Sequence, residues 1–208
     1  MRDEALKETF LSSQEIYRGA IIQVEKWQVS LPNGGTAIRE IVKHKGAAAI
    51  VPVDDKGYVT MVRQHRIAVD KFTWEIPAGK LDSLLEDPFD AAKRELEEET
   101  GLQAQHWHLL NRIVTTPGFC SERIAIYVAT GLSQHPSHPD PDEFLQLKRL
   151  PLDEAVAQCM AGEINDSKTV IGLLMAQRYL HDQAVPSFDA ASAIQRMSGA
   201  ASSLCGGK

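Results

Sequence analysis

Apolar and polar residues alternate along residues 16–42, on both sides of the run LPNGG at residues 31–35. Alternation with a period of two is typical of a strand with one buried face. A Pro-Asn-Gly-Gly cluster between two such runs indicates a hairpin turn. The N-terminal part of the chain is therefore predicted to form an antiparallel strand unit.

Continuous apolar runs come next in the chain. Residues 47–53 (AAAIVPV) and 58–64 (YVTMVRQ) flank a turn signal, and their composition predicts two largely buried strands. Further apolar runs of this kind lie at residues 72–79, 108–116, 123–132 and 144–150. Because these runs are separated by turns and by segments with helical spacing, a mixed α/β domain is expected.

The C-terminal part of the chain changes character twice. Apolar spacings of three and four predict helices over residues 152–162 and 166–180, the second with Asp166 or Ser167 as its N-cap. From residue 185 the composition shifts to Ala, Ser and Gly, which predicts a flexible tail over residues 185–208.

An acidic helix is predicted over residues 86–100. Phe89, Ala92 and Leu96 share one face, which can pack against a sheet. Glu86 and Arg94 lie within about a quarter-turn of each other, so an ion pair between them is expected. Gly101 follows the helix, and glycine suits a helix C-terminus.

Three carboxylates fall together on another face of this helix, at Glu95, Glu98 and Glu99. Their mutual repulsion costs stability unless a cation offsets it. A hard divalent cation such as Mg²⁺, which prefers oxygen ligands and often also binds substrate phosphates, meets that need. An acidic run is also typical of a solvated helix face, and charge alone leaves both interpretations open.

Composition narrows the function classes. The 208 residues carry 28 acidic and 22 basic side chains, a net charge of −6, which argues against a nucleic-acid partner. Three cysteines without a CxxC pair fit a reducing compartment, so a cytoplasmic location is expected. The charged start MRDEALKETF does not resemble a secretory signal, and no apolar run is long enough to suggest a membrane role.

The stretch from Gly79 to Leu102 resembles the Nudix box. Glu86 and Arg94 have the family spacing, and residues 94–102 (RELEEETGL) match throughout. One departure is an extra residue, because six residues and not five separate Gly79 from Glu86. The box is a specific signal, since nine matching positions at fixed spacing rarely occur by chance.

The resemblance extends over roughly residues 17–180 to the ADP-ribose pyrophosphatase branch of the nucleoside-diphosphate-sugar hydrolases. It is carried by YRG at residue 17, VRQHR at residue 62, WEIPAGKLD before the box and TPGFCSE after it. Pro117 lies fifteen residues beyond Leu102, close to the separation associated with ADP-ribose hydrolases. Ser121 stands where the branch often has an acid.

This resemblance implies a Nudix-type α/β/α sandwich around a mixed sheet, with an N-terminal antiparallel strand unit. The expected parts are a dimerisation unit at residues 1–45, a hydrolase domain at residues 46–184 and the tail. The implied reaction is Mg²⁺-dependent hydrolysis of ADP-ribose to AMP and ribose 5-phosphate, with Mn²⁺ as a second possible metal. Hydrolysis of GDP- or UDP-sugars and a nucleotide-sensing domain without catalysis are the alternatives.

The resemblance also assigns roles to residues. The implied metal ligands are the carboxylates of Glu95, Glu98 and Glu99, with the carbonyl of Ala78; Glu98 and Glu99 are also counted as catalytic. Glu143 is expected to position or deprotonate the attacking water, with Asp142 as the reserve candidate.

Substrate contacts are implied at five positions. Arg66 and Glu75 match residues that contact the nucleotide or its phosphates, and Arg39 matches an arginine that reaches across a domain-swapped homodimer. Pro117 is expected at the substrate. Glu122 lines the site or caps the turn before it, and the sequence leaves both open.

Overall fold

The computed structural model describes residues 3–137 and 144–184. Within these ranges it contains ten strands, three α-helices and a short 3-10 helix, η1 (Asp3–Leu6). Asp142, Glu143 and the predicted tail at residues 185–208 lie outside the described residues. Contacts divide the chain into a unit of residues 1–177, which holds every described strand, and a unit that begins at Arg178.

The central sheet has the strand order β7-β4-β9-β8, formed by β7 (Ala78–Lys80), β4 (Ala47–Pro52), β9 (Arg123–Gln134) and β8 (Leu102–Val114). Strands β4 and β9 are parallel, whereas the other two pairs are antiparallel. The predicted mixed sheet is therefore confirmed.

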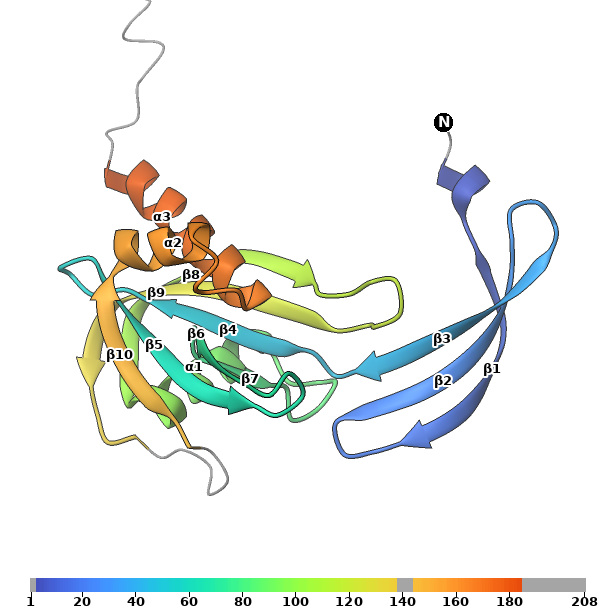
Figure 1. Cartoon of the computed structure of the whole chain (residues 1–208), viewed down its shortest axis with the longest axis horizontal. Coiled ribbons are helices and arrows are strands. Elements are labelled where there is room, and N and C mark those ends of the chain that lie inside the picture. The colour runs from blue at the N-terminus through green and yellow to red at the C-terminus, as the bar shows by residue number, and fades with distance from the viewer. Residues whose placement is uncertain (1–2, 138–143, 185–208) are drawn as a thin grey trace, which may run out of the picture. The chain divides into compact units, whose positions relative to one another are not determined.

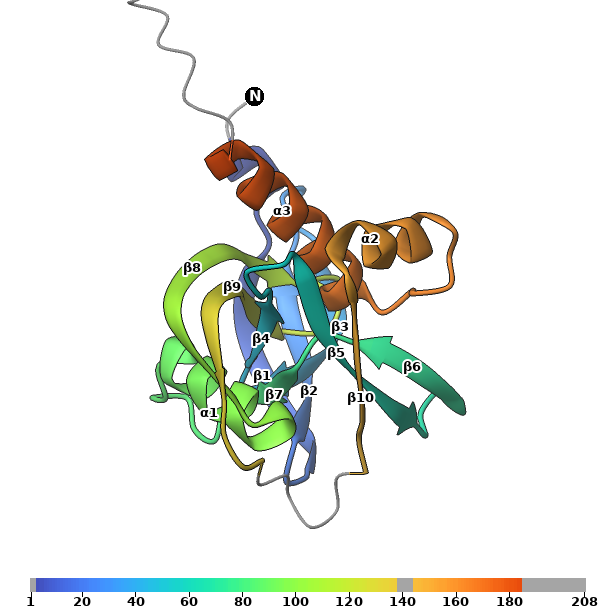
Figure 2. The ribbon, with the colours of Figure 1, turned by 90° about the vertical axis from the view of Figure 1, so that its left-hand side faces the viewer.

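Helices cover both faces of this sheet (Figures 1 and 2). Helix α1 (Pro88–Thr100) packs its fully buried Leu96 into a cluster with Ile50 of β4 and Tyr127 of β9. Helix α3 (Ser167–Ala184) approaches the other face so closely that a Cβ at Gly172 would lie 2.8 Å from Ile76 Cδ1. Because both faces of β4 and β9 are covered, these strands are continuous apolar runs and do not alternate.

A second sheet is antiparallel throughout, with the order β10-β5-β6, from β10 (Gln146–Pro151), β5 (Tyr58–Arg66) and β6 (Lys71–Glu75). Helix α2 (Leu152–Met160) follows β10 directly. The apolar run at residues 72–79 is thus shared between two sheets: β6 ends at Glu75, and β7 begins at Ala78. Pro77 lies between them, where a residue without an N–H interrupts strand pairing.

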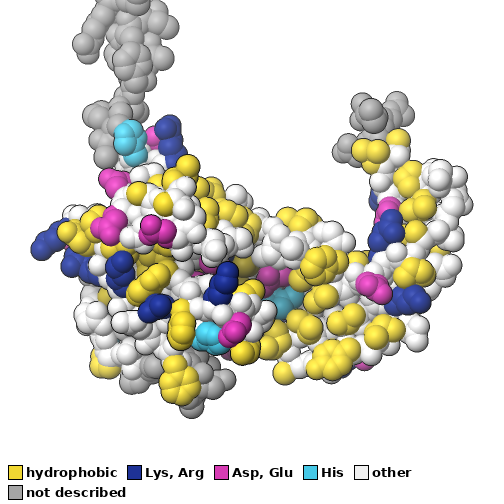
Figure 3. All heavy atoms as spheres, in the orientation of Figure 1, with side chains coloured by type: hydrophobic (Ala, Val, Ile, Leu, Met, Phe, Trp, Pro, Cys, Tyr) yellow, Lys and Arg dark blue, Asp and Glu magenta, His cyan; other side chains and the backbone are white. Residues whose placement is uncertain are grey.

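The N-terminal sheet consists of β1 (Thr9–Arg18), β2 (Ile22–Ser30) and β3 (Thr36–His44). The predicted hairpin joins β2 and β3, and Gly34 adopts a φ of 84° in its turn. Strand β1 begins seven residues before the predicted alternation at residue 16, because all ten of its residues are exposed and carry no clear alternation. Hydrophobic side chains gather on this sheet (Figure 3), including the exposed Phe10, Leu11 and Ile38.

None of the helices in the described ranges combines the length and apolar character that a bilayer span requires. The predicted division of the chain at residues 45/46 and 184/185 stays a prediction.

Candidate active site

Helix α1 is fixed at both ends by its sequence. Asp87 is the N-cap, because its side chain accepts a hydrogen bond from the Phe89 N–H at 2.8 Å, and Pro88 occupies the first helical position. Gly101 ends the helix with a φ of 67°, and a Cβ there would lie 2.3 Å from the His135 carbonyl oxygen. The helix therefore starts two residues later than predicted, and its apolar and acidic faces are retained.

Arg94 braces the acidic face. Its Nη1 donates to Glu95 Oε1 at 2.8 Å and to Glu98 Oε2 at 3.0 Å, and its Nη2 donates to Glu86 Oε1 at 3.3 Å. Burial alone would lower the pKa of Arg94, but the carboxylates of Glu95 and Glu98 outweigh it and raise that pKa well above its ordinary value. The predicted ion pair with Glu86 is confirmed.

The extra residue before Glu86 is absorbed by the loop between β7 and α1. The side chains of Leu84 and Leu85 project outward, with 79% and 96% exposure. Glu86 turns back into the loop, where its Oε2 accepts a hydrogen bond from the Asp82 N–H at 2.5 Å. The insertion is thus placed in solvent and leaves the contact between Glu86 and Arg94 intact.

Strand β7 lies against the carboxylates of α1. The Ala78 N–H donates to Glu99 Oε2 at 3.0 Å. A Cβ on Gly79 would lie 1.8 Å from Glu95 Oε1, so no larger residue fits there without moving that carboxylate. Glu95 and Glu99 are 7% and 4% exposed, respectively. This close approach explains physically why glycine begins the box.

A cavity of about 460 Å³ opens beside β7 and α1. It is lined by four residues that the sequence assigned to the site: Arg66, Ala78, Glu99 and Glu122. The same cavity also receives residues that the sequence did not assign, among them Gln64, Lys80, Thr115, Thr116, Ser167 and Lys168. Its volume suits a small-molecule ligand, and its walls carry charges of both signs.

Arg66 and Glu75 form a bidentate pair at this cavity. Arg66 Nε and Nη2 donate to the two carboxylate oxygens of Glu75 at 2.8 and 2.7 Å. Glu75 is 1% exposed and does not line the cavity, whereas the Arg66 side chain is 44% exposed. Burial alone would raise the pKa of Glu75, but the bonds from Arg66 and the charge of Lys168 lower it to about 2.

Glu122 reaches the cavity from the loop after β8. Its Oε1 lies 3.5 Å from Nδ1 of His44, and that nitrogen also accepts a hydrogen bond from the Gly46 N–H at 3.0 Å. The Ser121 N–H donates a hydrogen bond to the Val42 carbonyl oxygen at 2.9 Å, which connects the loop to the end of β3. Glu122 lines the cavity, and its predicted contact with substrate stays a prediction.

Four other predicted residues do not line this cavity: Glu95 and Glu98 of α1, Pro117 and Arg39. Pro117 is exposed in the turn next to Thr116, and it does not line the cavity. Arg39 lies on β3 and pairs with Glu8 through its Nη2. Glu143, the expected base, lies outside the described residues, so its role stays a prediction.

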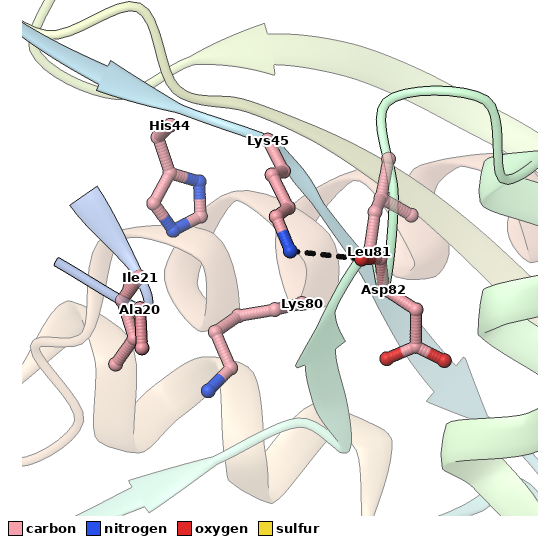
Figure 4. Close-up of a pocket in the computed structure, with 7 residues that line it drawn as sticks. All are labelled: Ala20, Ile21, His44, Lys45, Lys80, Leu81 and Asp82. Carbon is pink, nitrogen blue, oxygen red and sulfur yellow. Dashed lines mark hydrogen bonds between the residues drawn. The ribbon is translucent and has the colours of Figure 1, made fainter. Parts of the chain in front are cut away.

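A smaller recess of about 190 Å³ adjoins the cavity, with which it shares Ile21 and Lys80. Figure 4 shows His44, Lys45 and Lys80 around it. Lys45 Nζ donates to the Asp82 carbonyl oxygen at 2.8 Å, which fixes the loop before α1. The charged side chains that line the recess are Lys45, Lys80 and Asp82.

The donor set suits a hard cation. Carboxylates and a backbone carbonyl are the ligands that Mg²⁺ and Mn²⁺ prefer, and Glu99 and Ala78 both line the cavity. Among residues 3–137 and 144–184, however, no group of three or more His, Cys, Asp or Glu side chains already converges on one point. Arg94 Nη1 lies between Glu95 and Glu98 and donates to one oxygen of each carboxylate.

The mixed sheet, the braced acidic helix and the glycine against Glu95 define a Nudix hydrolase. A family model for the NUDIX domain matches residues 43–171. The chain belongs to the Nudix family, as its box predicts, and is an enzyme that acts on pyrophosphate bonds. Nudix hydrolases generally use divalent metal ions.

Known proteins resemble the chain over most of its length. It is 42% identical over 173 residues to a methanol dehydrogenase activator from Bacillus methanolicus, covering 82% of this chain and 93% of that one. It is 40% identical over 166 residues to an ADP-ribose pyrophosphatase from Mycobacterium tuberculosis, covering 79% and 80%, respectively. A crystal structure of an ADP compounds hydrolase matches with a TM-score of 0.75 and 25% identity, over 85% of this chain and 96% of that one.

Proposed function

We propose that this protein hydrolyses the pyrophosphate bond of ADP-ribose, giving AMP and ribose 5-phosphate, with Mg²⁺ as its metal. The observation that carries this proposal is one cavity lined by both Glu99 of the box and the cation Arg66. Such a cavity offers a metal-binding wall and a counter-charge for two phosphates. The 40% identity to an ADP-ribose pyrophosphatase supports ADP-ribose as the substrate.

The protein's own residues would orient the substrate and the metal. Glu95, Glu98 and Glu99, with the Ala78 carbonyl, would hold the metal, and Arg66 would bind phosphate oxygens. When bound, Mg²⁺ supplies positive charge against the phosphates and lowers the pKa of a bound water. Glu143 is proposed to position that water or take its proton.

A panel of nucleoside-diphosphate sugars tests the substrate. The purified protein is incubated with Mg²⁺ and ADP-ribose, a GDP-sugar or a UDP-sugar, and the products are identified by chromatography. We expect AMP and ribose 5-phosphate from ADP-ribose at the highest kcat/KM. Faster cleavage of a GDP- or UDP-sugar would shift the substrate within the same reaction, and binding without cleavage would favour the sensing alternative.

We also propose a homodimer that forms through the N-terminal sheet. Exposed Phe10, Leu11 and Ile38 support it, since a large exposed apolar face is a common mark of an interface. Arg39 would then reach the cavity of the second subunit. Sedimentation velocity tests this: we expect a dimer at micromolar concentration, and a strict monomer would refute it.

A cytoplasmic location is proposed from the unpaired Cys120 and Cys159.

A further inference from the structure

Lys168 shares the buried carboxylate that holds Arg66. Its Nζ donates to Glu75 Oε2 at 2.5 Å and to Asp166 Oδ2 at 3.1 Å. The Lys168 side chain is only 11% exposed, yet the residue lines the cavity. Glu75 therefore links a lysine at the start of α3 to an arginine at the end of β5.

The hydrogen bonds of Arg66 leave one edge of its guanidinium group available to a ligand. Nε and Nη2 donate to Glu75, whereas Nη1 has no hydrogen-bond partner in the described part of the chain. Thr73 Oγ1 donates to Glu75 Oε1 at 2.6 Å, so both oxygens of this carboxylate are held from several sides. A fixed carboxylate fixes the arginine, because a bidentate pair sets the orientation of the guanidinium plane.

The charges show why a second cation is needed. The side chains of Arg66, Lys168, Glu75 and Asp166 sum to zero formal charge. Without Lys168 they sum to −1, at a cavity whose other charged lining residues are Glu99, Glu122 and Lys80 and which has to accept an anionic pyrophosphate. The negative charge of Asp166 is partly offset without Lys168, because its Oδ2 accepts a hydrogen bond from the Thr169 N–H at 3.1 Å in the first turn of α3.

We propose that Lys168 is a positioning residue for substrate binding, acting through Glu75 to hold Arg66 toward the cavity. This inference rests on the proposed function, since Arg66 is taken to bind the phosphates of a nucleoside-diphosphate sugar. It adds α3 to the elements that form the site, by a contact between residues 93 positions apart.

Replacing the ammonium group tests the inference. Lys168→Met keeps most of the length of the side chain and removes its charge, so we expect KM for ADP-ribose to rise at least about 10-fold while kcat falls less than about 3-fold. Lys168→Arg, which keeps the charge and a donor for Glu75, is expected to recover most of that loss. Lys56→Met, at an exposed turn lysine outside the cavity, serves as the matched control and should leave KM unchanged.

A double-mutant cycle with Arg66 separates a positioning role from an independent one. If Lys168 acts through Arg66, the Arg66→Met/Lys168→Met variant should have a KM within about 2-fold of Arg66→Met alone. Two effects that multiply would overturn the inference, as would an unchanged KM in Lys168→Met. Should Lys168→Met not fold by circular dichroism, Lys168→Gln carries the same expectation, because it keeps a donor without the charge.

The wild-type enzyme is assayed first, which keeps two failures apart. If it releases no nucleoside monophosphate from any nucleoside-diphosphate sugar, the proposed function fails. If it cleaves ADP-ribose and Lys168→Met keeps the wild-type KM, only the role of Lys168 fails.

Discussion

The acidic side of the cavity is formed by residues close together in the sequence, whereas the cationic side is formed by residues far apart in it. The acidic side is local: β7, its connecting loop and α1 all lie within residues 78–100, and Arg94 braces them. The cationic side joins Arg66, Glu75 and Lys168, and the last two are 93 residues apart. A local motif can thus mark half of a site, whereas the other half exists only after the sheets and α3 have packed.

Loss of a box carboxylate should give the largest effect. We expect Glu99→Gln to lower kcat about 10³-fold, because it removes a charge that would hold the metal against the phosphates. The matched control is Glu97→Gln on the same helix, whose half-buried side chain accepts a hydrogen bond from Gln103 Nε2 at 3.0 Å. Steady-state kinetics and circular dichroism check both variants, and a folded Glu99→Gln with near-wild-type kcat would remove the acidic side from the site. The same outcome is expected for Glu98→Gln.

The fit between Gly79 and Glu95 should be the next most sensitive feature. Gly79→Ala would place a Cβ within 1.8 Å of the Glu95 carboxylate. We expect the displaced carboxylate to cost at least about 10-fold in activity and the overpacking about 1–3 kcal/mol of stability. Gly118→Ala is the stability control, because a Cβ there meets nothing within 4 Å. Equal stability and activity in both variants would show that the close approach is unimportant.

The cationic side should reveal itself in the pH dependence of stability. The pKa of Glu75 is lowered from 4.5 to about 2 in the folded protein. A carboxylate whose pKa is lower in the folded than in the unfolded protein stabilises the fold fully at pH values above its unfolded pKa. This contribution is lost as pH falls from about 4.5 toward 2. Glu75→Gln should therefore be about 3 kcal/mol less stable than wild type at pH 7, with a gap that narrows below pH 4.5. Urea unfolding measures it, and a gap independent of pH would contradict the pairing.

The cap of α3 should have the smallest effect. Asp166→Ala removes the acceptor for the Thr169 N–H and Oγ1, which lie at 3.1 and 2.6 Å, and should cost about 1 kcal/mol. Asp55→Ala, in an exposed turn, is the control and should stay within about 0.5 kcal/mol. Thermal melting compares the two, and equal stability would mean that Asp166 does not cap the helix.

The separation of contacting residues along the sequence also explains which features could be predicted. Helix α1, its apolar face at Leu96 and the brace between Arg94 and Glu86 follow from spacings of a few residues, and all are confirmed. The N-cap of α3 is Asp166, one of the two predicted candidates. Local spacing sufficed in each case.

Features set by tertiary contacts were missed. Lys168 stands in a helical pattern without any signal that its amine meets Glu75. Strand β1 is exposed along its whole length, so no alternation marks its start. The run at residues 72–79 is one continuous pattern, but its two halves join different sheets. Pro77 was the one available sign of that break.

Metal-dependent release of AMP from ADP-ribose tests the central claim most directly. The wild-type protein is assayed with Mg²⁺ and with EDTA, and the Glu98→Gln variant is assayed with Mg²⁺. The nucleotide products of the three reactions are quantified by chromatography. We expect AMP and ribose 5-phosphate in equal amounts from the wild type with Mg²⁺, and almost none in the other two reactions. Equal release of AMP with EDTA or by a folded Glu98→Gln variant would contradict a metal-dependent site on α1.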